Sequence, residues 1–199
     1  VLLPILLNFV KLMNKKDLIY ILKNNYFNVI NGNEDLLLAA RVDGGYSYSF
    51  SEADLVQLLN KSIEIASSNF DGEIVFNHAS NQAIVQRADH AMLTSAFLNI
   101  IENAVKYAKE SKKIIVNLKS LKNQYSLEIV DFGQGIPKAE RDNIFNKFYR
   151  IGNEDTRKTK GTGLGLHIVK QVITAHKGLV SVKANVPNGS IFSILLPDK

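Results

Sequence analysis

Residues 131–136 read Asp-Phe-Gly-Gln-Gly-Ile and directly follow an alternating apolar segment that predicts a β-strand. An acid at the end of such a strand, followed by two glycines, marks a place where the backbone can approach a flat ligand. The Asp131 carboxylate can accept a hydrogen bond from an exocyclic amine, and Gly133 and Gly135 keep side chains out of the path. An ordinary glycine turn after the strand is the alternative interpretation.

A second glycine stretch, Lys160-Gly161-Thr162-Gly163-Leu164-Gly165-Leu166, opens a predicted helix over about residues 163–176. Glycines at a helix start leave backbone N–H groups free to face an anion, and the helix dipole favours negative charge there. The spacing differs from the dinucleotide fingerprint, and the stretch lacks the Gly-Lys-Ser/Thr ending of a P-loop. Phosphate binding is the chemistry that this stretch predicts, with a structural turn as the alternative.

A third stretch, residues 99–107, reads Asn-Ile-Ile-Glu-Asn-Ala-Val-Lys-Tyr within a predicted helix. Asn99, Asn103 and Lys106 recur at helical spacing and therefore share one face. An Asn oxygen can ligate Mg²⁺, which also retains waters, and Lys106 can reach a phosphate. A solvated helix face is the alternative.

The remaining pattern predicts an α+β fold, a two-layer α/β sandwich with a mixed, mostly antiparallel sheet and helices on one face. Ser51 and Asp54 resemble a capping box that opens a helix over residues 51–67, and Asp89 is predicted to cap a helix over about 90–108. Strands are predicted over 73–77, 83–86, 113–120, 125–131, 179–184 and 190–196. The stretch 132–161 is irregular, holds one short helix near 138–145, and is predicted to be a functional lid because loops of this length are uncommon in compact domains.

Residues 1–45 are Leu-rich and predict an α-helical hairpin segment that precedes the sandwich, interrupted near Asn31-Gly32-Asn33 and stopped by Asp43-Gly44-Gly45. The apolar run 1–13 is too short to span a bilayer, which needs about 20 residues. Because the chain opens on Val, we expect a fragment, with any membrane contact supplied by a region upstream.

Composition excludes several kinds of site. The chain has no cysteine, so a disulfide framework, a thiolate metal site and a Cys nucleophile are excluded. Four separated histidines offer no zinc ligand pair. The net charge of +5 comes from Lys and Arg scattered along the chain, so we expect no nucleic-acid binding.

Taken together, these stretches resemble the GHKL ATP-binding superfamily, and specifically the catalytic domain of histidine kinases with its Bergerat fold. Residues 99–107 resemble the N box and residues 131–136 the G1 box. Residues 144–150 (Ile-Phe-Asn-Lys-Phe-Tyr-Arg) resemble the F box, and residues 161–166 the G2 box. Asn188-Gly189 resembles the closing turn, and the order of all these stretches matches that of the family from about Ser51 to Pro197.

The resemblance implies a role for each matching position. Asn103 would hold Mg²⁺ against the phosphates of ATP, and Asp131 would accept from the adenine amino group. Gly133, Gly135, Ile136 and Tyr107 would line the nucleotide. Residues from Lys160 to Leu166 would anchor the lid and present helix amides, and Asn99, Lys106 and Arg150 would serve catalysis. The lid, about 146–162, carries a basic strip for the triphosphate: Lys147, Arg150, Arg157, Lys158 and Lys160.

The reaction implied is transfer of the γ-phosphoryl group to a histidine rather than hydrolysis. ATPases of the superfamily carry a general-base Glu four residues before the Mg-binding Asn, and Asn99 occupies that position here. An amide cannot deprotonate water. A nucleotide-binding regulator without transfer and an anti-sigma-type serine kinase are the alternatives.

The resemblance also implies partners. Residues 1–45 would be a partial dimerisation and phosphoacceptor-type segment, and residues 46–199 the kinase domain. We expect a homodimer through the N-terminal helices, a response regulator receiver domain as phosphoryl recipient, and a cytoplasmic location. If Pro4 matches the family's motif proline, the acceptor histidine falls before Val1 and outside this sequence.

Overall fold

The computed structural model describes residues 33–79, 83–107, 111–152 and 161–198. The expectations for residues 1–32, including the run 1–13, Pro4 and the interruption near Asn31, lie outside the described residues. So do Arg157, Lys158 and Lys160 of the basic strip, and the predicted helix end at Ala108.

A five-stranded sheet forms one layer of the fold, in the order β2-β4-β5-β7-β6. Its strands are β2 (Glu73–His78), β4 (Lys113–Leu121), β5 (Gln124–Asp131), β6 (Leu179–Ala184) and β7 (Ser190–Pro197). The pair β2–β4 is parallel and the other three pairs are antiparallel. The predicted mixed, mostly antiparallel sheet is therefore confirmed.

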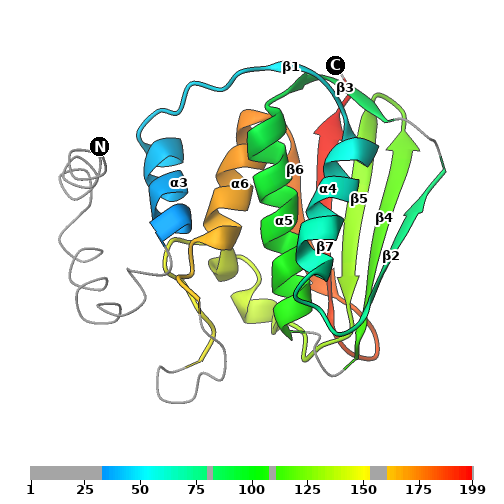
Figure 1. The fold of residues 1–199 in the computed structure, drawn as a ribbon. Coiled ribbons are helices and arrows are strands. Elements are labelled where there is room, and N and C mark those ends of the chain that lie inside the picture. Colours follow the sequence, from blue (N-terminus) through cyan, green and yellow to red (C-terminus); the bar gives the residue numbers. More distant parts are fainter. Residues whose placement is uncertain (1–32, 80–82, 108–110, 153–160, 199) are drawn as a thin grey trace.

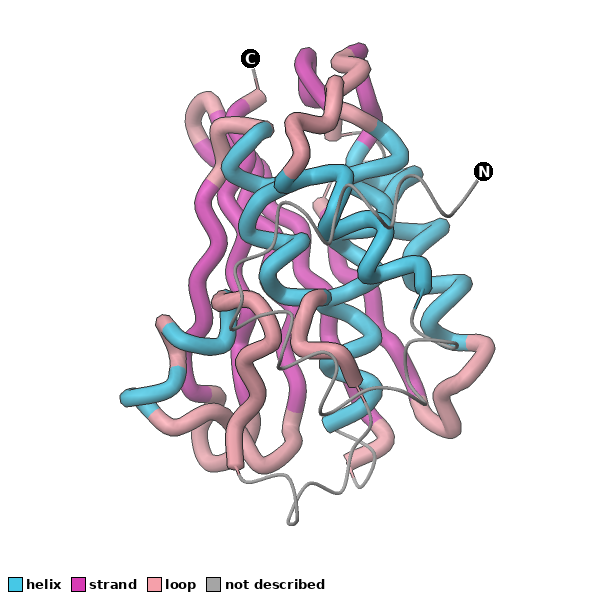
Figure 2. Tube along the Cα trace, turned by 90° about the vertical axis from the view of Figure 1, so that its left-hand side faces the viewer, coloured by secondary structure: helices cyan, strands magenta, loops and turns pink. Residues whose placement is uncertain are grey.

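Helices α4 (Leu55–Ser67), α5 (His90–Tyr107) and α6 (Gly165–Ala175) form the second layer on one face of the sheet (Figures 1 and 2). The central helix α5 buries Leu93, Ala96, Phe97, Ile100 and Ala104 at helical spacing. The sheet meets it with alternate residues such as Ile114, Val116 and Leu118 of β4. The two periodicities thus place one apolar core between the layers.

Helix α3 (Asn33–Asp43) lies beside α6, on the side away from α4 (Figure 1). Its Ala39 is buried, and Leu36, Leu38 and Val42 pack against the core. The helix stops where the sequence predicts, because Gly44 N–H donates to Ala40 O at 2.9 Å and Gly45 has a φ of +84°.

The prediction that a capping box at Ser51 opens a helix is wrong. Ser51–Asp54 is a strand, β1, which pairs antiparallel with β3 (Ile84–Ala88) in a separate two-stranded sheet. Helix α4 begins at Leu55, and the Asp54 carboxylate caps it by accepting from Val56 N–H at 2.9 Å. The other predicted cap is confirmed, because Asp89 accepts from Met92 N–H at 3.1 Å.

The segment between β5 and α6 differs in detail from the expectation. The predicted short helix over 138–145 is two separate 3₁₀ turns, η1 (Lys138–Glu140) and η2 (Asn143–Phe145). Helix α6 begins at Gly165, two residues later than predicted, because Gly163 has a φ of +75° that a helix interior excludes.

Candidate functional site

The C-terminal half of α5 carries the first group of predicted site residues. Asn99 is tied down, because its Nδ2 donates to Ser95 O at 3.0 Å. Asn103 and Lys106 are half-buried, and the Lys106 ammonium lies 5.1 Å from the centre of the exposed Tyr107 ring. Since the cap at Asp89 and the buried apolar row fix this helix, these side chains have a rigid base.

Asp131 ends β5 as a buried carboxylate, with only 4% of its surface exposed. Gly133 N–H donates to its Oδ1 at 2.9 Å, and Ser190 donates through both its backbone and its hydroxyl. Burial raises the pKa of Asp131 above the ordinary value, although these hydrogen bonds act in the opposite direction. A buried, hydrogen-bonded carboxylate of fixed orientation is a specific acceptor for a ligand N–H group.

The glycines after Asp131 lie where the chain passes other main-chain segments closely. Gly133 packs against the main-chain carbonyl of Tyr107, at the end of α5. Gly135 has a φ of +74° and lies against Gly189, where a Cβ would come within 2.9 Å of the Gly189 oxygen. Ile136 packs partly against the core, and its carbonyl accepts from Arg141 Nε at 3.2 Å. The segment 131–136 is therefore held between α5 and the turn before β7.

The second glycine stretch closes on α5 and on the segment 144–150. A side chain at Gly161 would come within 2.8 Å of the Lys106 ammonium. Gly163 lies against the Phe148 main chain, and Phe148 N–H donates to Gly163 O at 3.0 Å. The Thr162 hydroxyl accepts from Leu164 N–H at 3.3 Å, immediately before α6.

Contact between Gly165 and the Asn99 side-chain oxygen completes the junction of α5 and α6. Leu164 is fully buried and Leu166 packs partly against the core, so both position the backbone of the loop. Arg150 is half-buried at the end of the segment 144–150. All the predicted site residues except Lys160 are described, and the glycine contacts join four segments that are far apart in the sequence.

Sequence reasoning missed Ser190 and Asn185, which both hold Asp131. Asn185 Nδ2 donates to the Asp131 carbonyl at 2.9 Å, and Asn185 N–H donates to Gly189 O at 3.0 Å. Both residues lie close in sequence to Asn188-Gly189, the predicted closing turn, and this was the feature that could have indicated them. The Tyr149 hydroxyl also donates to Glu140, which links the 144–150 segment to η1 and raises the pKa of Tyr149.

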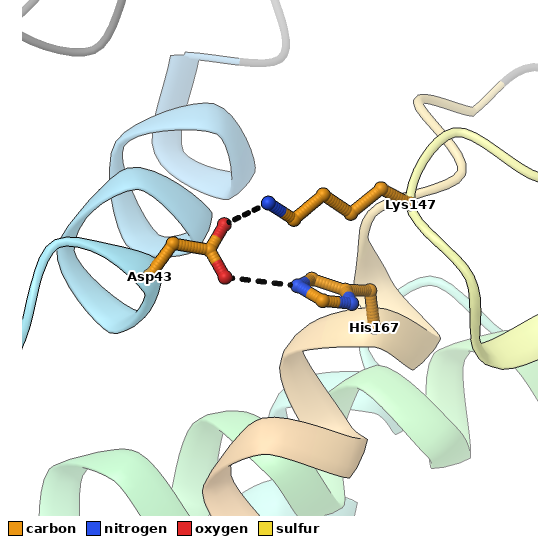
Figure 3. A network of polar contacts seen from close by, with 3 residues as sticks. All are labelled: Asp43, Lys147 and His167. Carbon is orange, nitrogen blue, oxygen red and sulfur yellow. Dashed lines mark hydrogen bonds and ion pairs between the residues drawn. The ribbon is translucent and has the colours of Figure 1, made fainter. Parts of the chain in front are cut away.

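A further missed group joins α3 to the loop and to α6. The Asp43 carboxylate lies between Lys147 and His167 (Figure 3), at 2.7 Å from Lys147 Nζ and 3.1 Å from His167 Nε2. His167 is buried and follows Gly165 by two residues, so this contact sits at the start of α6.

Within the described residues, no set of three or more His, Asp or Glu side chains is placed to hold a metal ion. Across the same residues, every helix falls short of the length and apolarity that a membrane crossing requires. The buried Asp131 acceptor, the close main-chain approaches and the Lys106 ammonium beside the loop that opens α6 together suit a ligand with a flat polar base and an anionic tail.

Comparison with known proteins gives the same picture. Residues 88–199 match the family described as histidine kinase-, DNA gyrase B- and HSP90-like ATPases. The chain is 31% identical over 166 residues to the sensor protein kinase WalK of Staphylococcus saprophyticus, which covers 82% of this chain and 27% of WalK. It is 32% identical over 166 residues to WalK of Staphylococcus aureus, with 82% and 40% covered. The chain thus spans about a quarter of the length of the first curated relatives it matches.

Solved structures agree with this match. The mycobacterial sensor histidine kinase MprB is 30% identical, with a TM-score of 0.63, and the alignment covers 76% of this chain and 99% of that one. Full-length ShkA, solved in complex with AMPPNP, is 25% identical with a TM-score of 0.69, covering 82% and 34%. The Acinetobacter baumannii histidine kinase AdeS, 22% identical with a TM-score of 0.68 over all of this chain and 93% of its own, shares the fold.

Proposed function

This chain belongs to the histidine kinase-, DNA gyrase B- and HSP90-like ATPase family as a catalytic domain of the sensor histidine kinase type, and we propose that it binds Mg-ATP and passes the γ-phosphoryl group to a histidine. The observation that carries the proposal is the junction of the end of α5, the Asp131 segment and the Gly161–Gly165 loop around Lys106 and Tyr107. The AMPPNP complex of ShkA supports an adenine nucleotide as the ligand.

Asp131 is the proposed adenine acceptor. Its carboxylate is buried and already oriented by Gly133 and Ser190, so an exocyclic amine meets a fixed oxygen without reorganisation. Gly133, Gly135, Ile136 and Tyr107 are the proposed lining of the base. Gly133 and Gly135 pass other main-chain segments closely and bring no side chain between the backbone and the base.

The phosphates are proposed to lie between Lys106 and the start of α6. Gly161 lies against the Lys106 ammonium, so the loop backbone and this charge converge on one anion position. Thr162, Gly163, Leu164 and Gly165 lead into the first turn of α6. The first N–H groups of this helix have no intrahelical acceptors, so they favour negative charge. Arg150 and Lys160 are proposed to add positive charge, and Leu166 to hold the helix start in the core.

Asn103 is the proposed Mg²⁺ ligand. It is half-buried and one turn before Tyr107 on α5, and an amide oxygen suits a hard cation that keeps waters and takes its other ligands from phosphates. The absence of a carboxylate cluster in the described residues fits a metal that arrives with the nucleotide. When bound, Mg²⁺ would neutralise charge on the phosphates.

Transfer rather than hydrolysis is proposed because position 99 cannot act as a base. The Asn99 amide donates to Ser95 O and its oxygen packs against Gly165, so it joins two helices. Phosphoryl transfer needs positioning and charge neutralisation, which the other residues offer. Three of the four histidines are poor acceptors: His167 and His176 are buried, and His90 lies thirteen residues before Asn103, about 20 Å along α5.

The wider assignment follows from this role. We propose a boundary near residue 45, a phosphoaccepting histidine outside residues 1–199, a homodimer through the N-terminal helices and a response regulator receiver domain as final recipient. Because ATP is the proposed substrate, we also propose a cytoplasmic location for residues 1–199, with any membrane anchor elsewhere in the parent protein.

Two measurements test the proposal. Asn103→Ala should abolish Mg-AMPPNP binding in titration calorimetry, whereas Asn117→Ala, on the outer side of β4 beside Asn77, should leave it unchanged. Incubation with γ-labelled Mg-ATP should give bound nucleotide without acid-labile label on this chain. Normal binding by Asn103→Ala would remove the metal assignment, and acid-stable label would favour the serine-kinase alternative.

A further inference from the structure

Helix α3 presents two carboxylates to the residues that flank the start of α6. Asp43, whose side chain is 24% exposed, bridges Lys147 Nζ at 2.7 Å and His167 Nε2 at 3.1 Å (Figure 3). Eight residues earlier, Asp35 accepts from the Thr162 hydroxyl at 3.3 Å. We call these two acids and their three partners the α3 latch.

The latch contacts compensate for an unfavourable position of Asp43. This residue ends α3, where the helix dipole is negative and disfavours a carboxylate. Lys147 supplies the opposite charge, and the His167 ring donates its Nε2–H to the acid, because a carboxylate only accepts. Asp43 therefore gains its stabilisation from the catalytic domain rather than from its own helix.

The groups that hold the two acids also border the proposed phosphate position. Thr162 belongs to the glycine loop, His167 lies in the first turn of α6, and Lys147 belongs to the segment 144–150. A triphosphate bound at the proposed position adds negative charge near Asp35 and Asp43, and charges of the same sign repel.

Resting on the proposed function, we propose that the α3 latch and Mg-ATP are negatively coupled: α3 docked through Asp35 and Asp43 lowers nucleotide affinity, and bound nucleotide loosens α3. The coupling is reciprocal by thermodynamic necessity. It makes the position of α3 a control on nucleotide loading, because any event that pulls α3 from α6 also frees Lys147 and Thr162 for the phosphates.

The test uses the full chain and two charge-matched variants. Asp35→Asn with Asp43→Asn removes both latch charges while keeping side-chain size. Asp71→Asn with Glu73→Gln removes two charges at the sheet edge, where Asp71 pairs with exposed Lys112, and serves as the control. Mg-AMPPNP affinity is measured by calorimetry at low salt, where surface charge effects are strongest. Amide hydrogen exchange of residues 33–43 then reports docking of α3.

The latch variant should bind Mg-AMPPNP at least about fivefold more tightly than wild type, and the control within about twofold. Saturating nucleotide should speed exchange of the α3 amides in wild type, and the latch variant should exchange faster without nucleotide. Equal affinity of the latch variant and wild type, or α3 exchange unaffected by nucleotide, would overturn the coupling alone. Absence of nucleotide binding in every variant would overturn the proposed function and this inference with it.

Discussion

Asp131→Asn is expected to weaken nucleotide binding strongly while leaving the fold intact. The change keeps the shape of a side chain that is 4% exposed and replaces one acceptor oxygen by an N–H₂ donor. Asp131 accepts from Gly133 N–H and from both donors of Ser190, so the new donor meets groups that also donate.

The expected effect on stability is small because two contributions oppose each other. A donor without an acceptor in a buried position costs about 1–3 kcal/mol, although the Ser190 hydroxyl can rotate to accept. Burial raises the pKa of Asp131, so its favourable contribution to stability is complete below the unfolded pKa and is lost as pH rises through the folded value. At pH 7.5 the ionised carboxylate therefore carries a desolvation cost that the neutral amide of the variant removes. We expect a Tm within about 8 °C of wild type.

The expected effect on nucleotide affinity is large because both contributions weaken binding. The adenine amino group loses a hydrogen bond to a charged acceptor, worth about 1.5–3 kcal/mol, and faces a donor that stays unpaired, which costs about 1–3 kcal/mol more. The sum is about 2.5–6 kcal/mol, or roughly sixtyfold to about twenty-thousandfold in Kd. Acidification should weaken wild-type binding as Asp131 takes up a proton.

The assay is titration calorimetry of Mg-AMPPNP at pH 7.5, with thermal unfolding of the same samples. Ser190→Ala is the matched control, because it removes one hydrogen bond to Asp131 and keeps the carboxylate; its affinity should stay within about fivefold of wild type. Binding by Asp131→Asn within about threefold of wild type would refute the assignment of Asp131 as the adenine acceptor.

Three further predictions concern other parts of the fold. Burial lowers the pKa of His176, whose Nε2 accepts from Asp89 N–H. The free energy of unfolding should therefore fall as pH drops below about 6.5, by at most about 1.4 kcal/mol per pH unit. Urea unfolding of His176→Gln should show a weaker dependence of stability on pH. Gly163→Ala places a residue with a side chain at a φ of +75°, which costs about 1–2 kcal/mol. The new Cβ would also come within 2.7 Å of the Phe148 main chain. Calorimetry should show at least about tenfold weaker nucleotide binding. Phe97→Ala should cost about 3–5 kcal/mol in urea unfolding, whereas Ile65→Ala, on the exposed side of α4, should cost much less; similar values for both would contradict the assigned core.

The elements that could be predicted are those whose signals are local. Helix α5 has a cap at Asp89 and an apolar row at helical spacing, so its start was predicted correctly. The strands around Lys122-Asn123 alternate cleanly and turn at Asn123, which has a φ of +61°. The order of the motif stretches was enough to predict the family, and the order of the expected helices and strands was enough to predict the two-layer fold.

Features set by distant pairing could not be predicted. Ser51 sits in a strand because Ile84–Ala88 pairs with it, and no residue near Ser51 signals this partner. Strands β2 and β3 are neighbours in sequence but belong to different sheets, since β2 pairs in parallel with β4. The contact of Asp43 with His167 spans 124 residues between polar side chains, which carry no periodicity to reveal it.

Asn99 shows how the same geometry limits the chemistry of this site. Its amide bonds back to Ser95 O while its oxygen packs against Gly165, so the side chain serves as the joint between α5 and α6. A carboxylate there would lack the N–H₂ donor for Ser95 O and would place a charge beside the N-terminal turn of α6, in competition with a phosphate. The amide leaves that turn free for the nucleotide. The lack of a base at position 99 and the free helix start at the proposed phosphate position thus follow from one side chain, and we expect slow hydrolysis together with tight nucleotide binding.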